Sequence, residues 1–137
     1  MPYKNTFIQV AEDCPITSSE IPTLRGKKKS IHLIQYELLT ENPYTLTHKD
    51  LIFAVHVQRK GISAAELAEN KAALWADLFQ KEHPCLRASS LTKRYGWGAH
   101  YNEEGKIALF GMDSPEYQQF VQDEATKQLK AMRSKRK

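Results

Sequence analysis

The sequence predicts an α+β fold, in which a single two-layer domain holds about four mainly antiparallel strands with helices on one face. Two local patterns favour this class. Residues 95–101 and 106–111 alternate on either side of a glycine-containing turn, as in a β-hairpin, and Ser63 opens a strongly signalled helix. The length of 137 residues fits one domain, and a composition of 41% hydrophobic and 26% charged residues is that of a globular protein.

The N-terminal part of the chain predicts a strand, a loop and a helix, in that order. Residues 6–10 alternate in the manner of a short strand. Residues 15–29 contain two prolines and several hydroxyl side chains without a sustained period, so we expect an exposed loop. Ser30 is placed as the N-cap of a helix, which Pro43 ends by biasing Asn42 away from the α region.

The middle of the chain predicts a buried strand and a second helix. Residues 51–57 are almost wholly apolar, which is typical of a strand in the interior of a sheet. Ser63 and Glu66 have the spacing of a capping box. Helical spacing then gathers large apolar residues into one arc, which we expect to face the core: Leu67, Leu74, Trp75, Leu78 and Phe79. Lys71 lies inside this arc, where it either extends its stem across apolar surface or serves as a functional cation.

The clearest strand signal is a hairpin in the last third of the chain. Residues 102–105 have the composition of a four-residue turn, with glycine in last place. Pairing the flanking strands around that turn puts Trp97 opposite Phe110, which is a structural reason for both aromatic rings.

A last helix and a basic tail follow the hairpin. Ser114 and Pro115 have the order of an N-cap and a first helical residue. We therefore expect residues 1–124 to form the single α+β domain, and residues 125–137 to form a basic C-terminal tail that is partly helical.

The positive charge is concentrated in this tail. It supplies six cations, and subtracting them from the net charge of +4 leaves −2 for the rest of the chain. A nucleic-acid-associated protein would use the tail together with the loop Arg25–Lys29, Lys93 and Arg94, through phosphate contacts that do not read sequence. The alternative is a solvated chain end.

The segment from Ser89 to His100 concentrates hydroxyls, cations, aromatic rings and glycines, and it is the main candidate for function. Hydroxyls and guanidinium groups hold phosphates and carboxylates. Strand alternation leaves one face nearly bare, where either a ligand or a packed helix can approach the backbone. We expect a small anionic ligand or an acidic partner to bind through these candidates: Ser90, Thr92, Lys93, Arg94, Gly96, Gly98 and His100, with Lys71 as a further cation. The alternative is a solvated loop leading into a hairpin, and no glycine-rich nucleotide-binding pattern is present.

A rival hypothesis is an enzyme that uses a cysteine with His100 as acid or base. Cys85 lies near Arg87 in the sequence and is more easily activated than Cys14, which follows two acidic residues. The alternative for each cysteine is a small buried hydrophobe or an unreactive thiol. No histidine or cysteine recurs at a metal-ligand spacing, so the sequence indicates no metal and no cofactor.

The sequence predicts a soluble cytoplasmic protein. No apolar stretch reaches the length of a membrane span, and residues 1–10 lack the pattern of an export signal. The cysteines form no Cys-x-x-Cys pair, which favours free thiols. The sequence specifies no oligomeric state.

Several strings along the chain are familiar together. They include Val10-Ala11-Glu12-Asp13-Cys14-Pro15, Leu91-Thr92-Lys93-Arg94-Tyr95-Gly96-Trp97-Gly98 and Lys130-Ala131-Met132-Arg133-Ser134. With these strings the chain resembles, over nearly its whole length, a family of small bacterial proteins of unknown function. The resemblance implies no activity, ligand or catalytic residue. It places residues 130–134 inside the family pattern, which favours a packed or partner-binding tail.

Overall fold

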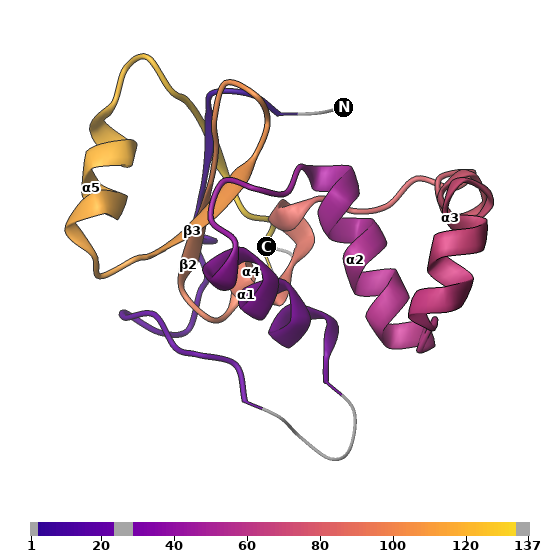
Figure 1. Cartoon of the computed structure of the whole chain (residues 1–137). Coiled ribbons are helices and arrows are strands. Elements are labelled where there is room, and N and C mark those ends of the chain that lie inside the picture. The colour runs from indigo at the N-terminus through magenta and orange to yellow at the C-terminus, as the bar shows by residue number, and fades with distance from the viewer. Residues whose placement is uncertain (1–2, 24–28, 134–137) are drawn as a thin grey trace.

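A mixed β-sheet lies at the centre of the molecule (Figure 1). This computed structural model describes residues 3–23 and 29–133. Within those residues the strands are β1 (Thr6–Gln9), β2 (Trp97–Tyr101), β3 (Ile107–Gly111) and β4 (Lys127–Lys130), in the spatial order β3-β2-β1-β4. β2 is antiparallel to β1 and β3, whereas β4 is parallel to β1. The predicted α+β class with a mostly antiparallel sheet is confirmed.

Helices lie on both faces of this sheet. One face carries α1 (Ile31–Glu41) and α2 (His48–Lys60), with α3 (Ala64–Leu78) beyond them. The short η1 (Leu86–Ala88) and α4 (Ser90–Lys93) lead into β2. α5 (Pro115–Gln122) lies on the opposite face (Figure 1). The sequence predicted this helix, but it placed all the helices on one face of the sheet.

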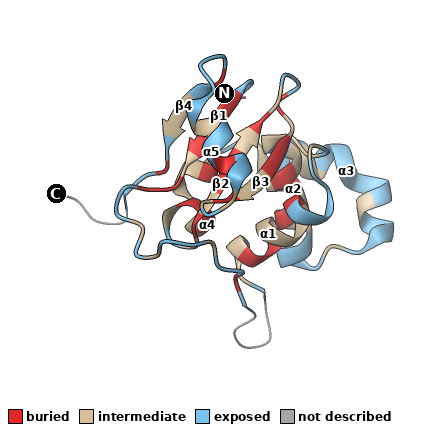
Figure 2. Cartoon of the chain, turned by 90° about the vertical axis from the view of Figure 1, so that its left-hand side faces the viewer, coloured by how far each residue is buried: buried red, intermediate tan, exposed pale blue. Residues whose placement is uncertain are grey.

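Alternating side chains of β1 explain why both faces need helices. Ile8 packs with Tyr101 and Ile107 into the larger core, under α1 and α2. Phe7 points the other way and packs against Tyr117 of α5, with ring centroids 5.1 Å apart. Buried segments accordingly concentrate in and around the sheet (Figure 2). Because neighbouring strand residues face opposite ways, two apolar neighbours need two covers.

Residues 51–57, predicted as an interior strand, belong to helix α2, so that prediction was wrong. The Thr47 hydroxyl accepts the N–H of Asp50, whose carboxylate accepts the N–H of Thr47. Gly61, with φ of 64°, follows the last turn. α2 lies between α1 and α3 (Figure 1), so residues on two of its sides are apolar. Such a run has no clear helical period and is indistinguishable from a buried strand.

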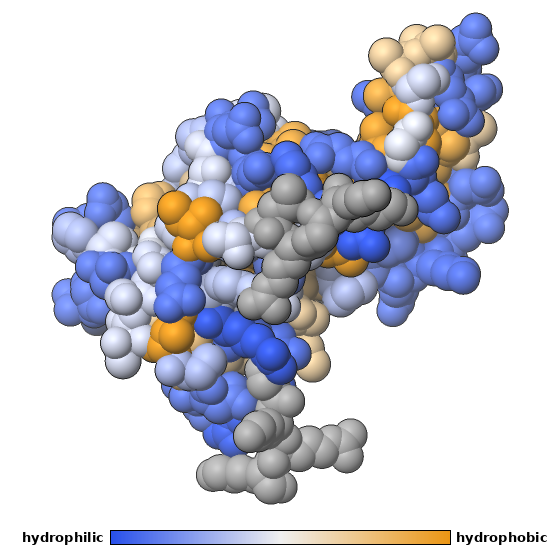
Figure 3. Space-filling model, turned by 90° about the horizontal axis from the view of Figure 1, so that it is seen from below, coloured by the Kyte–Doolittle hydropathy of each residue, from blue (hydrophilic) through white to orange (hydrophobic). Residues whose placement is uncertain are grey.

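α3 begins at the predicted residue but does not face the core. The Ser63 hydroxyl accepts the N–H of Glu66 at 3.1 Å, which is one of the two hydrogen bonds of the predicted capping box. The apolar arc packs against α2, where Trp75 meets Phe53 with ring centroids 5.0 Å apart, and no residue of α3 is fully buried. At this end of the molecule hydrophobic atoms reach the surface among charged ones (Figure 3).

The hairpin formed by β2 and β3 is confirmed, but its register differs by one residue from the prediction. Trp97 lies opposite Gly111 instead of a phenylalanine. The N–H of Asn102 donates to the carbonyl oxygen of Lys106 at 2.9 Å, and Gly105 has φ of 78°. The loop therefore has three residues and ends in a left-handed glycine, which is a common hairpin arrangement.

The basic tail begins with a strand, so the predicted partial helix is wrong within the described residues. β4 pairs in parallel with β1 over its full length. Just beyond β1, Glu12 forms salt bridges to Lys130, at 3.0 Å, and to Arg133. Residues 134–137 lie outside the described part of the chain.

Candidate functional site

The segment that the sequence singled out folds as α4 followed by β2. Ser89 caps α4, since its hydroxyl accepts the N–H of Leu91 and donates to Gln35 Oε1 at 2.7 Å. Thr92 is fully buried, and its hydroxyl donates to the carbonyl oxygen of Leu86. Thr92 therefore secures α4 to η1 and does not face a ligand.

Both glycines of the segment are surrounded by protein atoms. Gly96 has φ of 78°, and a Cβ there would lie 2.8 Å from Met112 Sδ. A Cβ on Gly98 would lie 2.6 Å from Phe7 Cζ and 2.7 Å from Tyr117 Cε2. The bare face of β2 is thus occupied by α5, which was the packed-helix alternative.

His100 lies on this same face as a packed, hydrogen-bonded ring. Its Nδ1 is 2.8 Å from the Tyr44 hydroxyl, and its ring stacks on Phe120 with centroids 4.1 Å apart. Burial lowers the pKa of His100 below its usual value, and the charge of Asp123 offsets part of that change. The folded protein therefore favours the neutral imidazole.

The cationic candidates are spread over the surface. Lys93 and Arg94 end α4, the first half-buried and the second exposed. Lys71 is exposed on α3, which lies beyond α2 and away from β2 (Figure 1). None of the three forms a salt bridge with a described residue. The structure does not bring Lys71 to the segment around Ser90.

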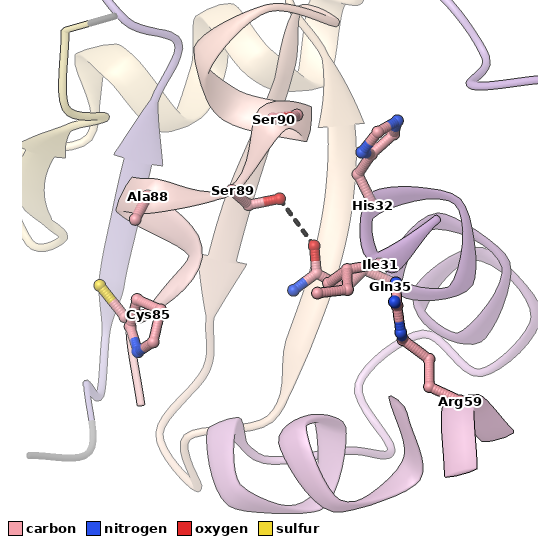
Figure 4. A pocket seen from close by; sticks show the side chains of 9 residues that line it. Ile31, His32, Gln35, Arg59, Cys85, Ala88, Ser89 and Ser90 are labelled. Atoms are coloured by element: carbon pink, nitrogen blue, oxygen red, sulfur yellow. Dashed lines mark hydrogen bonds between the residues drawn. The ribbon is translucent and has the colours of Figure 1, made fainter. Parts of the chain in front are cut away.

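Among the candidates, Ser90 lines a hollow (Figure 4). This hollow, of about 350 Å³, lies between α1, the end of α2 and residues 84–90. A second hollow, of about 290 Å³, adjoins it and has four lining residues in common with it: Ile31, Gln35, Arg59 and Pro84. The two hollows form one groove, which we call the α1–α2 groove.

The two ends of the α1–α2 groove differ in chemistry. The first hollow presents the Ser90 hydroxyl, the His32 ring and the Arg59 guanidinium. The His32 ring is held by stacking on Tyr95, with centroids 5.0 Å apart. The second hollow is mainly apolar, and its lining includes Ile52, Val55 and Leu78. Arg59 forms no salt bridge with a described residue, so its fork of donors remains available.

Sequence reasoning did not identify His32, Gln35 or Arg59. Arg59 was not identified because residues 51–57, which precede it, were predicted as a strand. That prediction gave no reason to place Arg59 beside Ser90. The capping box at Thr47 and Asp50 is the signal that would have revealed α2 and its cationic end.

Cys85 and His100 lie on opposite sides of the sheet, so the proposed pair is not assembled. Cys85 Sγ is 3.5 Å from the Tyr3 hydroxyl and close to Tyr101. Tyr101 and His100 are neighbours in β2 and face opposite ways. Cys14 packs beside the smaller core on the α5 face, and it forms no hydrogen bond to His100 among the described residues.

Metal binding and nucleic-acid binding were the other chemistries considered from the sequence. No three metal-ligating side chains gather within residues 3–23 and 29–133. Part of the basic charge is paired, as Lys29 lies 2.7 Å from Glu37. Residues 25–28 of the basic loop are outside the described part. Within residues 3–23 and 29–133, no helix is long and apolar enough to cross a membrane.

The fold and the groove together define a small α+β domain with a surface groove that is polar at one end and apolar at the other. The chain matches the model of a family of unknown function (DUF6157) over residues 1–137, and it belongs to that family. The resemblance seen in the sequence is thereby confirmed. Comparisons with curated proteins and with solved structures gave no match.

Proposed function

We propose that this domain binds a small amphipathic anion in the α1–α2 groove. The observation that carries the proposal is the continuity of the two hollows through Arg59, which lines both. A carboxylate or phosphate at the polar end and an apolar chain along the other end would fit this division. The proposal retains Ser90 from the sequence prediction and replaces the other candidates with residues of α1 and α2.

The polar end offers donors that suit an anion. The Arg59 guanidinium can bind two oxygens at once. Ser90 Oγ makes none of the side-chain hydrogen bonds found among the described residues. Gln35 Oε1 is occupied by Ser89, which leaves the Gln35 amide N–H₂ as the group free to donate (Figure 4). These groups define a recognition site for oxygens that carry negative charge.

The apolar end would supply affinity by burying hydrocarbon. Ile52 and Leu78 are half-buried there, beside the buried Val55. Each methylene group removed from water contributes about 0.8 kcal/mol. We therefore expect affinity to rise with chain length until the second hollow is filled, whereas a short anion such as acetate binds weakly.

A thermal-shift series on the full chain tests this proposal. The probes are straight-chain carboxylates and alkyl phosphates of increasing length, each with its neutral alcohol as a control. A ligand present at about 100 times its Kd adds about 2.7 kcal/mol to the free energy of unfolding. For a domain of this size that raises Tm by roughly 8–12 °C.

Arg59→Ala should raise Kd by about 10- to 150-fold, the equivalent of losing a charge-assisted hydrogen bond. Arg94→Ala is the matched control, because Arg94 is exposed and does not line the α1–α2 groove. Equal stabilisation by anions and neutral alcohols would contradict the proposal. The same applies if both arginine variants respond alike.

A further inference from the structure

Three side chains from distant parts of the sequence meet behind the polar hollow. The Tyr3 hydroxyl lies 3.5 Å from Cys85 Sγ, and the Tyr3 and Tyr101 rings form an edge-to-face pair with centroids 5.2 Å apart. The Tyr101 hydroxyl interacts electrostatically with both Cys85 and Tyr3. We call these three residues the Tyr3–Cys85–Tyr101 cluster.

The Tyr101 hydroxyl is the unusual member of this cluster. It is fully buried and has no hydrogen-bond partner of ordinary geometry among the described residues. The backbone N–H of Leu86 faces its oxygen and acts against the rise in the Tyr101 pKa that burial causes. That N–H is a donor, so it provides no acceptor for the hydroxyl proton. A buried hydroxyl without an acceptor costs free energy, and this loss is removed if an acceptor is placed beside it.

Cys85 is the place where such an acceptor can arise. Its side chain is half-buried and is one of those that line the first hollow of the groove (Figure 4). Arg87 lies close enough to lower the pKa of Tyr3, against the larger effect of Cys85 and of burial, which raise it. The thiolate is the form of a cysteine that attacks peroxides.

We propose that Cys85 is an oxidation site, at which hydrogen peroxide forms a sulfenic acid that the hydroxyls of Tyr101 and Tyr3 hold. The thiolate sulfur attacks one peroxide oxygen, so an S–O bond forms and the O–O bond breaks. The sulfur loses two electrons to the peroxide, and the departing hydroxide takes a proton and leaves as water. The new oxygen accepts the Tyr101 hydroxyl proton that has no acceptor in the reduced protein. This inference does not depend on the ligand proposed for the groove.

The first test compares the two cysteines of the same molecule. The reduced full chain is treated with hydrogen peroxide in the presence of dimedone, which traps sulfenic acids, and the labelled peptides are quantified by mass spectrometry. Cys14 is the internal control, because it is also half-buried but its sulfur has no hydroxyl at hydrogen-bonding distance among the described residues, whereas Cys85 Sγ has the hydroxyl of Tyr3. We expect Cys85 to be labelled about ten times faster than Cys14. Equal labelling of the two, or faster labelling of Cys14, would overturn the proposal.

The second test removes the hydroxyl and keeps the ring. Tyr101→Phe should shorten the lifetime of the Cys85 sulfenic acid by about 5- to 10-fold, the effect of one lost hydrogen bond. Tyr44→Phe is the control, since Tyr44 is bound to His100 on the other face, and it should leave the lifetime unchanged. A lifetime that Tyr101→Phe does not alter would show that the hydroxyl holds no sulfenic oxygen.

Discussion

Gly98→Ala tests whether the bare face of β2 is filled by α5. A Cβ at this position would lie 2.6 Å from Phe7 Cζ and 2.7 Å from Tyr117 Cε2, well inside ordinary van der Waals contact. Both of those rings are buried and pack against each other, so neither can move away freely. Overpacking of this kind costs about 1–3 kcal/mol.

The lower conformational entropy of the unfolded chain with alanine opposes this cost, so its contribution is subtracted from the cost of overpacking. Gly98 does not have a positive φ, so alanine can adopt its conformation and gains about 0.4–1 kcal/mol from the lower entropy of the unfolded chain. The middles of the two ranges, about 2 and about 0.7 kcal/mol, give an expected net loss of about 1.3 kcal/mol in the free energy of unfolding, measured by urea denaturation. The second mutation Phe7→Leu should make Gly98→Ala less costly, because it removes the ring that the new Cβ meets.

Gly111→Ala is the matched control for this prediction. It makes the same substitution in the neighbouring strand, but its Cβ would meet Ser19 Oγ at 2.5 Å, and Ser19 Cβ and the Asp113 carboxylate at 3.0 Å. Ser19 must shift and its hydrogen bond to Asp113 must break, but no buried ring is displaced, so the loss should be smaller than for Gly98→Ala. If Gly98→Ala were neutral or stabilising, the packing of α5 on β2 described above would be wrong.

Two other substitutions test how the chain is tied together. Tyr117→Phe should lower the free energy of unfolding, measured by urea denaturation, by about 1–3 kcal/mol. The buried N–H of Val10, which lies 2.8 Å from the Tyr117 hydroxyl, would be left without an acceptor. A loss under about 0.5 kcal/mol would show that this hydrogen bond does not stabilise the fold. Hydrogen bonds from Lys130 and Arg133 lower the pKa of Glu12 to about 2, from 4.5. Since the folded-state pKa is the lower one, the stabilisation is present above pH 4.5 and is lost as the pH falls toward about 2. The difference in urea midpoint between the parent protein and Glu12→Gln should therefore shrink over that interval, and a constant difference would show that the salt bridges do not stabilise the fold.

Local signals in the sequence predicted most helix starts correctly. Ser30, Ser63 and Ser114 each accept a backbone N–H three residues further on, as N-caps do. These predictions succeed because a cap needs only its own helix turn. The hairpin was equally local, and its register was missed only because a three-residue loop with a left-handed glycine has nearly the same sequence pattern as a four-residue turn.

The errors arose where tertiary context decides the structure. Residues 51–57 pack between two other helices, and this burial conceals the helical period. β4 has no β-branched residue, and it is a strand because β1 offers a free edge to pair with. The groove was missed for the same reason. Ser90 and Arg59 come together only through the packing of α1 on both α2 and α4.

The pairing of β4 with β1 also constrains how the protein is made. β1 begins at Thr6 and its parallel partner begins at Lys127, so one side of the first strand stays open until residues 127–130 have been synthesised. Pairing of such distant segments is slow, and during translation Phe7 and Ile8 are exposed beside an unpaired strand edge. The nascent protein is thus most prone to aggregate before its C-terminal strand emerges. A chain stalled ahead of residue 127 is the form that would most need a chaperone.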